Sequence, residues 1–150
     1  MKKTEKNIKF YEAVGRRKTS VARVRFYLVN KDKVADVNGQ KIKQGEIVVN
    51  NLPVEKFFSR DYQVNYLKEP LKLTNNEDRF AISILVKGGG KTGQLDAIIH
   101  GIARALVLVD ESYKPLLRQQ GWITRDPRKK ERRKVGTGGK ARREKQSPKR

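Results

Sequence analysis

Residues 88–93 have the spacing of a phosphate-binding loop. They read Gly-Gly-Gly-Lys-Thr-Gly, which satisfies G-x-G-x-x-G, and Asp110 and Glu111 follow about 20 residues later. In a dinucleotide site, however, the acidic residue ends a second parallel strand, whereas Asp110 is expected at the end of a helix. The chain after Asp110 is also too short for a doubly wound sheet. A P-loop fails too, because its first glycine would fall at Leu85.

A simpler chemistry for this segment is anion binding through the backbone. Free N–H groups at a helix N-terminus, flanked by two lysines, attract a phosphate group. The whole chain of 150 residues has a formal net charge of +20, so a polynucleotide phosphate is the expected anion. The residues predicted to contact the polynucleotide here are Lys87, Gly88, Gly89, Gly90 and Lys91.

A second cationic segment lies near the N-terminus. Residues 15–20 read Gly-Arg-Arg-Lys-Thr-Ser, and three cations beside two hydroxyl groups suit a turn that grips a phosphate. The strand expected after it alternates, with Val24 and Phe26 on an apolar face and arginines on the other. The predicted RNA-binding residues here are Arg16, Arg17, Lys18, Arg23 and Arg25.

The last 26 residues, 125–150, are called the arm. They hold 13 Lys or Arg against three acids, so the arm supplies +10 of the +20. With almost no apolar side chains, the arm is expected to be extended unless a polyanion orders it. Its predicted RNA-binding residues are Arg125, Arg128, Lys129, Lys130, Arg132, Arg133, Lys134, Lys140, Arg142, Arg143 and Lys145.

Catalysis has little support in the sequence. The chain has no cysteine and one histidine, so we expect no thiolate chemistry, no metal site and no cofactor. His100 falls in the middle of an expected helix, where a packed or hydrogen-bonded role is more common than that of a base. Because no nucleophile, base and orienting group come together, the sequence predicts a protein that is not an enzyme.

The sequence also predicts a soluble, intracellular protein. The first ten residues are basic, but they lead into no apolar stretch of signal-peptide length. No later segment is expected to span a bilayer, so no membrane partner is predicted.

Two strands around the turn at 15–20 are followed by a strand at 33–37 and a return strand from Lys41, joined at Asn38-Gly39. A strand at 47–49 precedes a short helix capped by Asn50 or Asn51 that runs to about Ser59. A second helix, from Asp61 or Tyr62, is expected to stop before Pro70. A buried strand at 79–87, a helix at 94–109 and a short helix at 111–119 complete the pattern.

This order predicts an α+β fold with a mostly antiparallel sheet packed on helices. Length and composition predict a globular RNA-binding body at 1–124, followed by the arm.

Several motifs together resemble small-subunit ribosomal protein nine, of the bacterial type. They are residues 15–24 (GRRKTSVARV), 86–90 (VKGGG) with Gly93-Gln94, 100–106 (HGIARAL), 124–128 (TRDPR), 130–134 (KERRK) and the final Lys149-Arg150. The resemblance runs in order from about residue 10 to the C-terminus.

The resemblance implies more than the residues themselves do. The fold of this chain would contain the left-handed βαβ crossover seen in the second domain of small-subunit ribosomal protein five. The body would bind the three-prime major domain of small-subunit ribosomal RNA in the head, beside other ribosomal proteins. The arm would reach the peptidyl site, where Lys149 and Arg150 would contact the transfer RNA during translation.

Two other functions stay open. A basic protein cofactor of another structured RNA, such as RNase P RNA, could share this charge pattern. A nucleotide-binding enzyme built on residues 88–93 is the third hypothesis, and the failed sequence context argues against it, as against any small-molecule substrate.

Overall fold

The computed structural model describes residues 10–29, 34–37 and 39–132. One sheet has the strand order β1-β2-β7-β5-β6, and β3 and β4 form a separate hairpin. The strands are β1 (Phe10–Arg17), β2 (Ser20–Leu28), β3 (Val34–Val37), β4 (Gln40–Lys43), β5 (Ile47–Val49), β6 (Leu52–Pro53) and β7 (Phe80–Lys87). The helices are α1 (Val54–Phe57), α2 (Asp61–Leu73), α3 (Lys91–Val109), the 3-10 turn η1 (Glu111–Tyr113) and α4 (Lys114–Gln119).

The larger sheet is mixed. β2 is antiparallel to β1 and β7, and β5 is antiparallel to β6 but parallel to β7. The chain passes from β5 to β7 through β6, α1 and α2, so these elements form a parallel crossover. The structure therefore confirms an α+β fold with a sheet packed on helices. The left hand of the crossover stays a prediction.

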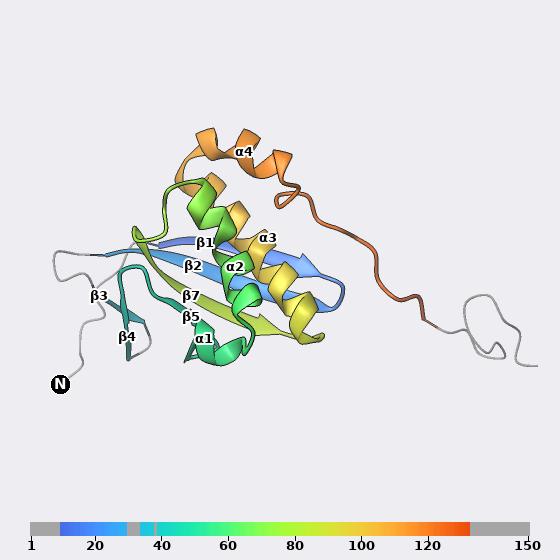
Figure 1. Cartoon of the computed structure of the whole chain (residues 1–150), viewed down its shortest axis with the longest axis horizontal. Coiled ribbons are helices and arrows are strands. Elements are labelled where there is room, and N and C mark those ends of the chain that lie inside the picture. The colour runs from blue at the N-terminus through green and yellow to red at the C-terminus, as the bar shows by residue number, and fades with distance from the viewer. Residues whose placement is uncertain (1–9, 30–33, 38, 133–150) are drawn as a thin grey trace, which may run out of the picture.

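Apolar alternation places the core between the sheet and the helices. Val24 and Phe26 of β2 are fully buried with Ile98, Ile102 and Leu106 of α3 in one cluster. Figure 1 shows α2 and α3 lying over one face of the sheet. The opposite face carries a smaller cluster, in which the β3–β4 hairpin contributes Ala35 and Ile42. The rest of that face is left for the arginines of β2.

Helix α3 is long and apolar. By length and composition alone, the segment Lys91–Val109 is apolar enough to cross a bilayer. In this structure α3 is the core helix, and 56% of its most apolar stretch is buried inside the fold. Its apolar residues serve to cover the sheet.

Pro70 does not end α2, contrary to the prediction. The helix runs to Leu73 with Pro70 inside it. A proline there removes one backbone hydrogen bond. Leu67, Pro70 and Leu71 are all buried, and the Thr74 hydroxyl donates to the Pro70 carbonyl at 3.0 Å. Burial of this apolar face offsets the lost bond, so the helix continues.

The predicted asparagine cap of the preceding helix, α1, is also wrong. α1 begins at Val54 after Pro53, with no side-chain cap. Asn50 and Asn51 instead adopt positive φ values of 48° and 66°. The Asn50 side chain accepts from the Val86 N–H at 2.9 Å and donates to the Val86 carbonyl at 3.0 Å, which extends the pairing between β5 and β7.

Two further boundaries differ from the predictions. Only Lys18 and Thr19 form the turn between β1 and β2, because Arg16 and Arg17 still pair with β2 in the strand ladder. Helix α3 starts at Lys91, three residues earlier than predicted, with Gly90 as its N-cap. The other predicted strands and the final short helix are confirmed to within two residues.

Candidate nucleic-acid interface

The two segments predicted to bind phosphate lie side by side. β2 pairs with both β1 and β7, and Val21 lies opposite Lys87, so the β1–β2 turn adjoins the end of β7. Gly88 and Gly89 have φ values of 76° and 64°. A Cβ on Gly88 would lie 2.5 Å from the Thr19 carbonyl oxygen. The Ser20 hydroxyl also donates to the Gly88 carbonyl at 3.0 Å.

The glycines therefore have a packing role: they let two turns approach closely at one end of the molecule (Figure 1). Arg16, Lys18 and Lys87 are exposed there, as is the backbone of residues 88–90. Lys91 is exposed but engaged, since its Nζ donates to the Phe57 carbonyl at 3.1 Å and lies 3.5 Å from the centre of the Phe57 ring. This end offers cations and N–H groups to an anion.

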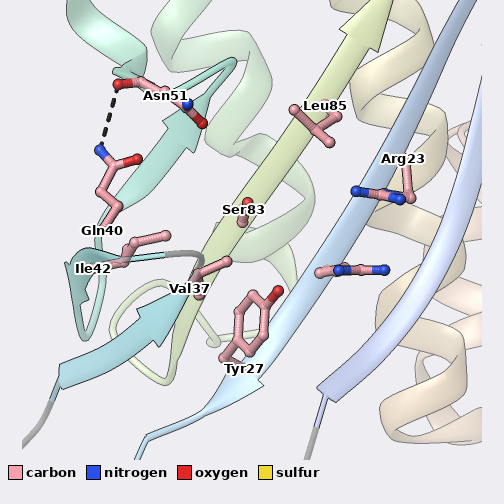
Figure 2. A pocket seen from close by; sticks show the side chains of 9 residues that line it. Arg23, Tyr27, Val37, Gln40, Ile42, Asn51, Ser83 and Leu85 are labelled. Carbon is pink, nitrogen blue, oxygen red and sulfur yellow. Dashed lines mark hydrogen bonds between the residues drawn. The ribbon is translucent and has the colours of Figure 1, made fainter. Parts of the chain in front are cut away.

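Arg23 and Arg25 lie on the open face of the sheet, as predicted. They line a groove with Tyr27 of β2, Ser83 and Leu85 of β7 and residues of the β3–β4 hairpin, which Figure 2 shows. The Arg25 guanidinium donates to the Glu12 carboxylate and lies 4.8 Å from the centre of the Phe10 ring. The Glu12 bond raises the pKa of Arg25, and the Glu12 carboxylate offsets part of the positive charge of this arginine.

The segment after α4 returns to the body before the arm leaves it. Trp122 and Ile123 are partly buried and pack against the main core. The His100 ring accepts from the Arg16 N–H at 3.2 Å through Nδ1, and it also hydrogen-bonds to the Ile123 backbone. Burial of the ring lowers the pKa of His100. The neutral ring thus connects α3, β1 and the base of the arm.

A charged cluster holds the first residues of the arm. The Arg17 guanidinium contacts Asp126 at 3.1 Å, Asp96 of α3 at 3.5 Å and the Arg128 carbonyl at 3.0 Å. Asp126 also accepts from the Arg128 backbone N–H at 2.9 Å and from its guanidinium at 2.8 Å. The Arg128 bonds hold the pKa of Asp126 far below its usual range.

The described part of the arm has no helix or strand between Arg125 and Arg132. Arg125, Arg128, Lys129, Lys130 and Arg132 are all exposed, so their cations are accessible to a polyanion. The remaining predicted arm residues lie outside the described residues: Arg133, Lys134, Lys140, Arg142, Arg143, Lys145, Lys149 and Arg150.

Sequence reasoning missed three residues that organise this end. They are Asp96 and Asp126, which hold Arg17, and Arg104, whose guanidinium donates to the Val14 carbonyl of β1. The order Asp-Pro-Arg at 126–128 carried a usable signal, because Asp side chains commonly accept from the backbone two residues on. Nothing in the sequence pairs Arg17 with Asp96. Within residues 10–29, 34–37 and 39–132, no cluster of three or more potential ligands could hold a metal ion.

A known protein family matches most of this chain. The model of the family described as ribosomal protein S9/S16 matches residues 15–150. The match begins at Gly15 and includes both turns that were predicted to bind phosphate. It extends through the arm, so it covers far more than half of the chain. Members of this family are structural proteins of the small ribosomal subunit, not enzymes. This chain belongs to the ribosomal protein S9/S16 family.

Proposed function

We propose that the body of this protein binds the three-prime major domain of small-subunit ribosomal RNA, in the head, and that the arm contacts peptidyl-site transfer RNA during translation. Family membership already makes the protein a constituent of the small subunit, with ribosomal RNA and ribosomal proteins as partners. The proposal adds where on the RNA it binds and what the arm does there. It also places the protein in the cytoplasm.

The meeting of three basic segments at one end of the molecule carries the proposal. The β1–β2 turn packs on residues 88–90 through Ser20, and the base of the arm is held against β1 by Arg17. Exposed cations occur in all three of these neighbouring segments, for example Lys18, Lys87 and Lys129. Closely spaced cations of this kind fit the phosphates of folded RNA better than one soluble nucleotide.

Within this proposal, the body and the arm have different targets. The exposed side chains Arg16, Lys18 and Lys87, the backbone of residues 88–90 and the groove arginines Arg23 and Arg25 would contact ribosomal RNA. The basic residues between Arg125 and Lys145 would extend that contact. Lys149 and Arg150 would contact the transfer RNA.

Crosslinking in native cells tests the proposal directly. Ultraviolet crosslinks would be sequenced on the RNA side and mapped to peptides on the protein side. The proposal expects three-prime major domain RNA on body peptides and transfer RNA on the last peptide. RNase P RNA in place of ribosomal RNA would favour the alternative of a cofactor for another structured RNA. The absence of crosslinked RNA would refute both.

Deletion of Lys149 and Arg150 separates the two halves of the proposal. We expect normal incorporation into small subunits, because the body and most of the arm's cations remain. Peptidyl-site transfer RNA should dissociate faster, since two charge-assisted contacts are lost. Transfer-RNA release from purified subunits and the sedimentation profile measure the two effects. Loss of assembly with unchanged transfer-RNA release would contradict this division between body and arm.

A further inference from the structure

The side chain of Arg17 is used within the chain rather than presented to solvent. Only 17% of the side chain is exposed. Its Nε faces Asp96 at 3.5 Å, one terminal nitrogen contacts Asp126 at 3.1 Å, and the other donates to the Arg128 carbonyl at 3.0 Å. One guanidinium nitrogen therefore donates a hydrogen bond to the chain, and the other two form ion pairs with it. Because the side chain is largely buried and engaged in these contacts, few of its five N–H groups are left for a phosphate.

The segment that Arg17 holds is itself closed into a turn. Asp126 accepts from the Arg128 N–H at 2.9 Å, and Pro127 between them has a fixed φ. Asp126 is also bonded to the Arg128 guanidinium, whose exposed fraction of 84% leaves its outer face toward solvent. A short turn of this kind moves as one unit, so holding it at Arg17 fixes the course of residues 126–128.

A second attachment lies three residues before this turn. Trp122 and Ile123 pack on the core, and the His100 ring is hydrogen-bonded to the backbones of both Arg16 and Ile123. The base of the arm is thus held at two points, one on His100 of α3 and one on Arg17 of β1. Two separated attachments define a direction, which a single attachment does not.

We propose that Arg17 is a positioning residue for the arm: with Asp96 and Asp126 it clamps the turn at 126–128 and sets the direction in which the arm leaves the body. The ion pairs are partly exposed and add little to folding stability. Their effect is to fix the position and direction of the first residues of the arm, which raises the local concentration of the arm at its target. The consequence for transfer RNA rests on the proposed function, whereas the clamp itself does not.

Spin labels test the clamp on the free protein. The chain has no cysteine, so Asn65→Cys on α2 and Lys130→Cys in the arm give one defined label pair on exposed sites. In the doubly labelled parent protein, pulsed electron paramagnetic resonance should show a narrow distribution of distances between the two labels. Adding Arg17→Gln should at least double the width of this distribution. Adding Asp126→Asn should broaden it too, and this residue lies outside every helix and strand. Arg16→Gln, the matched control on the same strand, should leave it unchanged.

An unchanged width in both Arg17→Gln and Asp126→Asn would overturn the proposal. The second readout is the salt dependence of binding to a three-prime major domain RNA fragment. If Arg17 contacts a phosphate in the complex, Arg17→Gln should reduce the slope of log affinity against log salt by about 1, which would also overturn the proposal. An unchanged slope supports the clamp. Failure of the full chain to bind this RNA would refute the proposed function and leave the label result intact.

Discussion

His100 shows how one side chain can join distant parts of the fold. Its ring hydrogen-bonds to Arg16 of β1 and to the Ile123 backbone, and burial lowers its pKa from the ordinary value of 6.5. The unfolded chain therefore binds a proton at pH values where the folded chain does not. The free energy of unfolding should be highest above about pH 6.5, fall as the pH drops through that value and level off below the folded pKa.

Two measurements check this prediction. Because His100 is the only histidine, a single imidazole signal reports its titration by nuclear magnetic resonance, and the midpoint should lie below 6.5. Urea unfolding between about pH 5 and 8 should show the loss of stability, and His100→Gln should remove most of it. The carboxylate of Asp126 titrates far lower and does not enter this window. A midpoint above 6.5 would contradict the buried neutral ring.

At the site, some residues could be placed from the sequence alone and others could not. The exposed cations Lys18, Lys87 and Lys129 could be predicted from residue type and spacing, because charged side chains stay at the surface. The environment of Arg17 could not, since the Arg128 carbonyl that it binds lies 111 residues further along the chain. Its identity as a cation was visible in the sequence, but its partners depend on how β1, α3 and the arm meet.

At the scale of elements, the closest packing occurs where β1 crosses α3. A Cβ on Gly15 would lie 1.9 Å from the Ala97 carbonyl oxygen and 2.3 Å from the Gly101 backbone nitrogen. Both neighbours are helix backbone, so the clash cannot be relieved by a side-chain rotation. Gly15→Ala should therefore force β1 away from α3 and lower the free energy of unfolding by about 1–3 kcal/mol or more.

Chemical denaturation measures this cost, and Gly90→Ala is the matched control. Gly90 has a negative φ, and a Cβ there would meet no atom within 4 Å, so the substitution should cost less than about 1 kcal/mol, mainly at the helix cap. Equal costs for the two variants would show that the crossing of β1 and α3 is less tight than the structure indicates.

Elements with a strong periodic pattern could be predicted from the sequence. The alternation in β2 and the helical spacing in α3 each reflect one buried face, and the apolar run of β7 reflects burial on both faces near the start of the strand. The predictions failed where contacts between distant parts of the chain determine the local structure. Pro70 stays in α2 because its neighbours are buried. Asn50 bonds to Val86 of β7 rather than capping a helix. The parallel pairing of β5 with β7 likewise depends on residues far apart in the chain.

At the scale of the whole molecule, charge is divided between a folded body and an arm. Residues 133–150 alone carry eight Lys or Arg and one acid, so they hold a large share of the positive charge of the chain. The body presents its cations on fixed strands and turns, where geometry selects the RNA that fits. The arm adds charge without a comparable core, so its contribution to binding should come chiefly from counterion release.

This division predicts a steep salt dependence that truncation should reduce. If the arm neutralises about eight phosphates, the affinity of the full chain for its RNA should fall by roughly three to five decades between about 50 and 200 mM salt. A chain ending at Arg132 keeps the clamp at Arg17 but loses eight cations, so its slope should be shallower by up to about 7. Filter binding across a salt series measures both slopes, and circular dichroism confirms that the truncated body is folded. Equal slopes would mean that the body's fixed cations, and not the arm, supply the electrostatic part of binding.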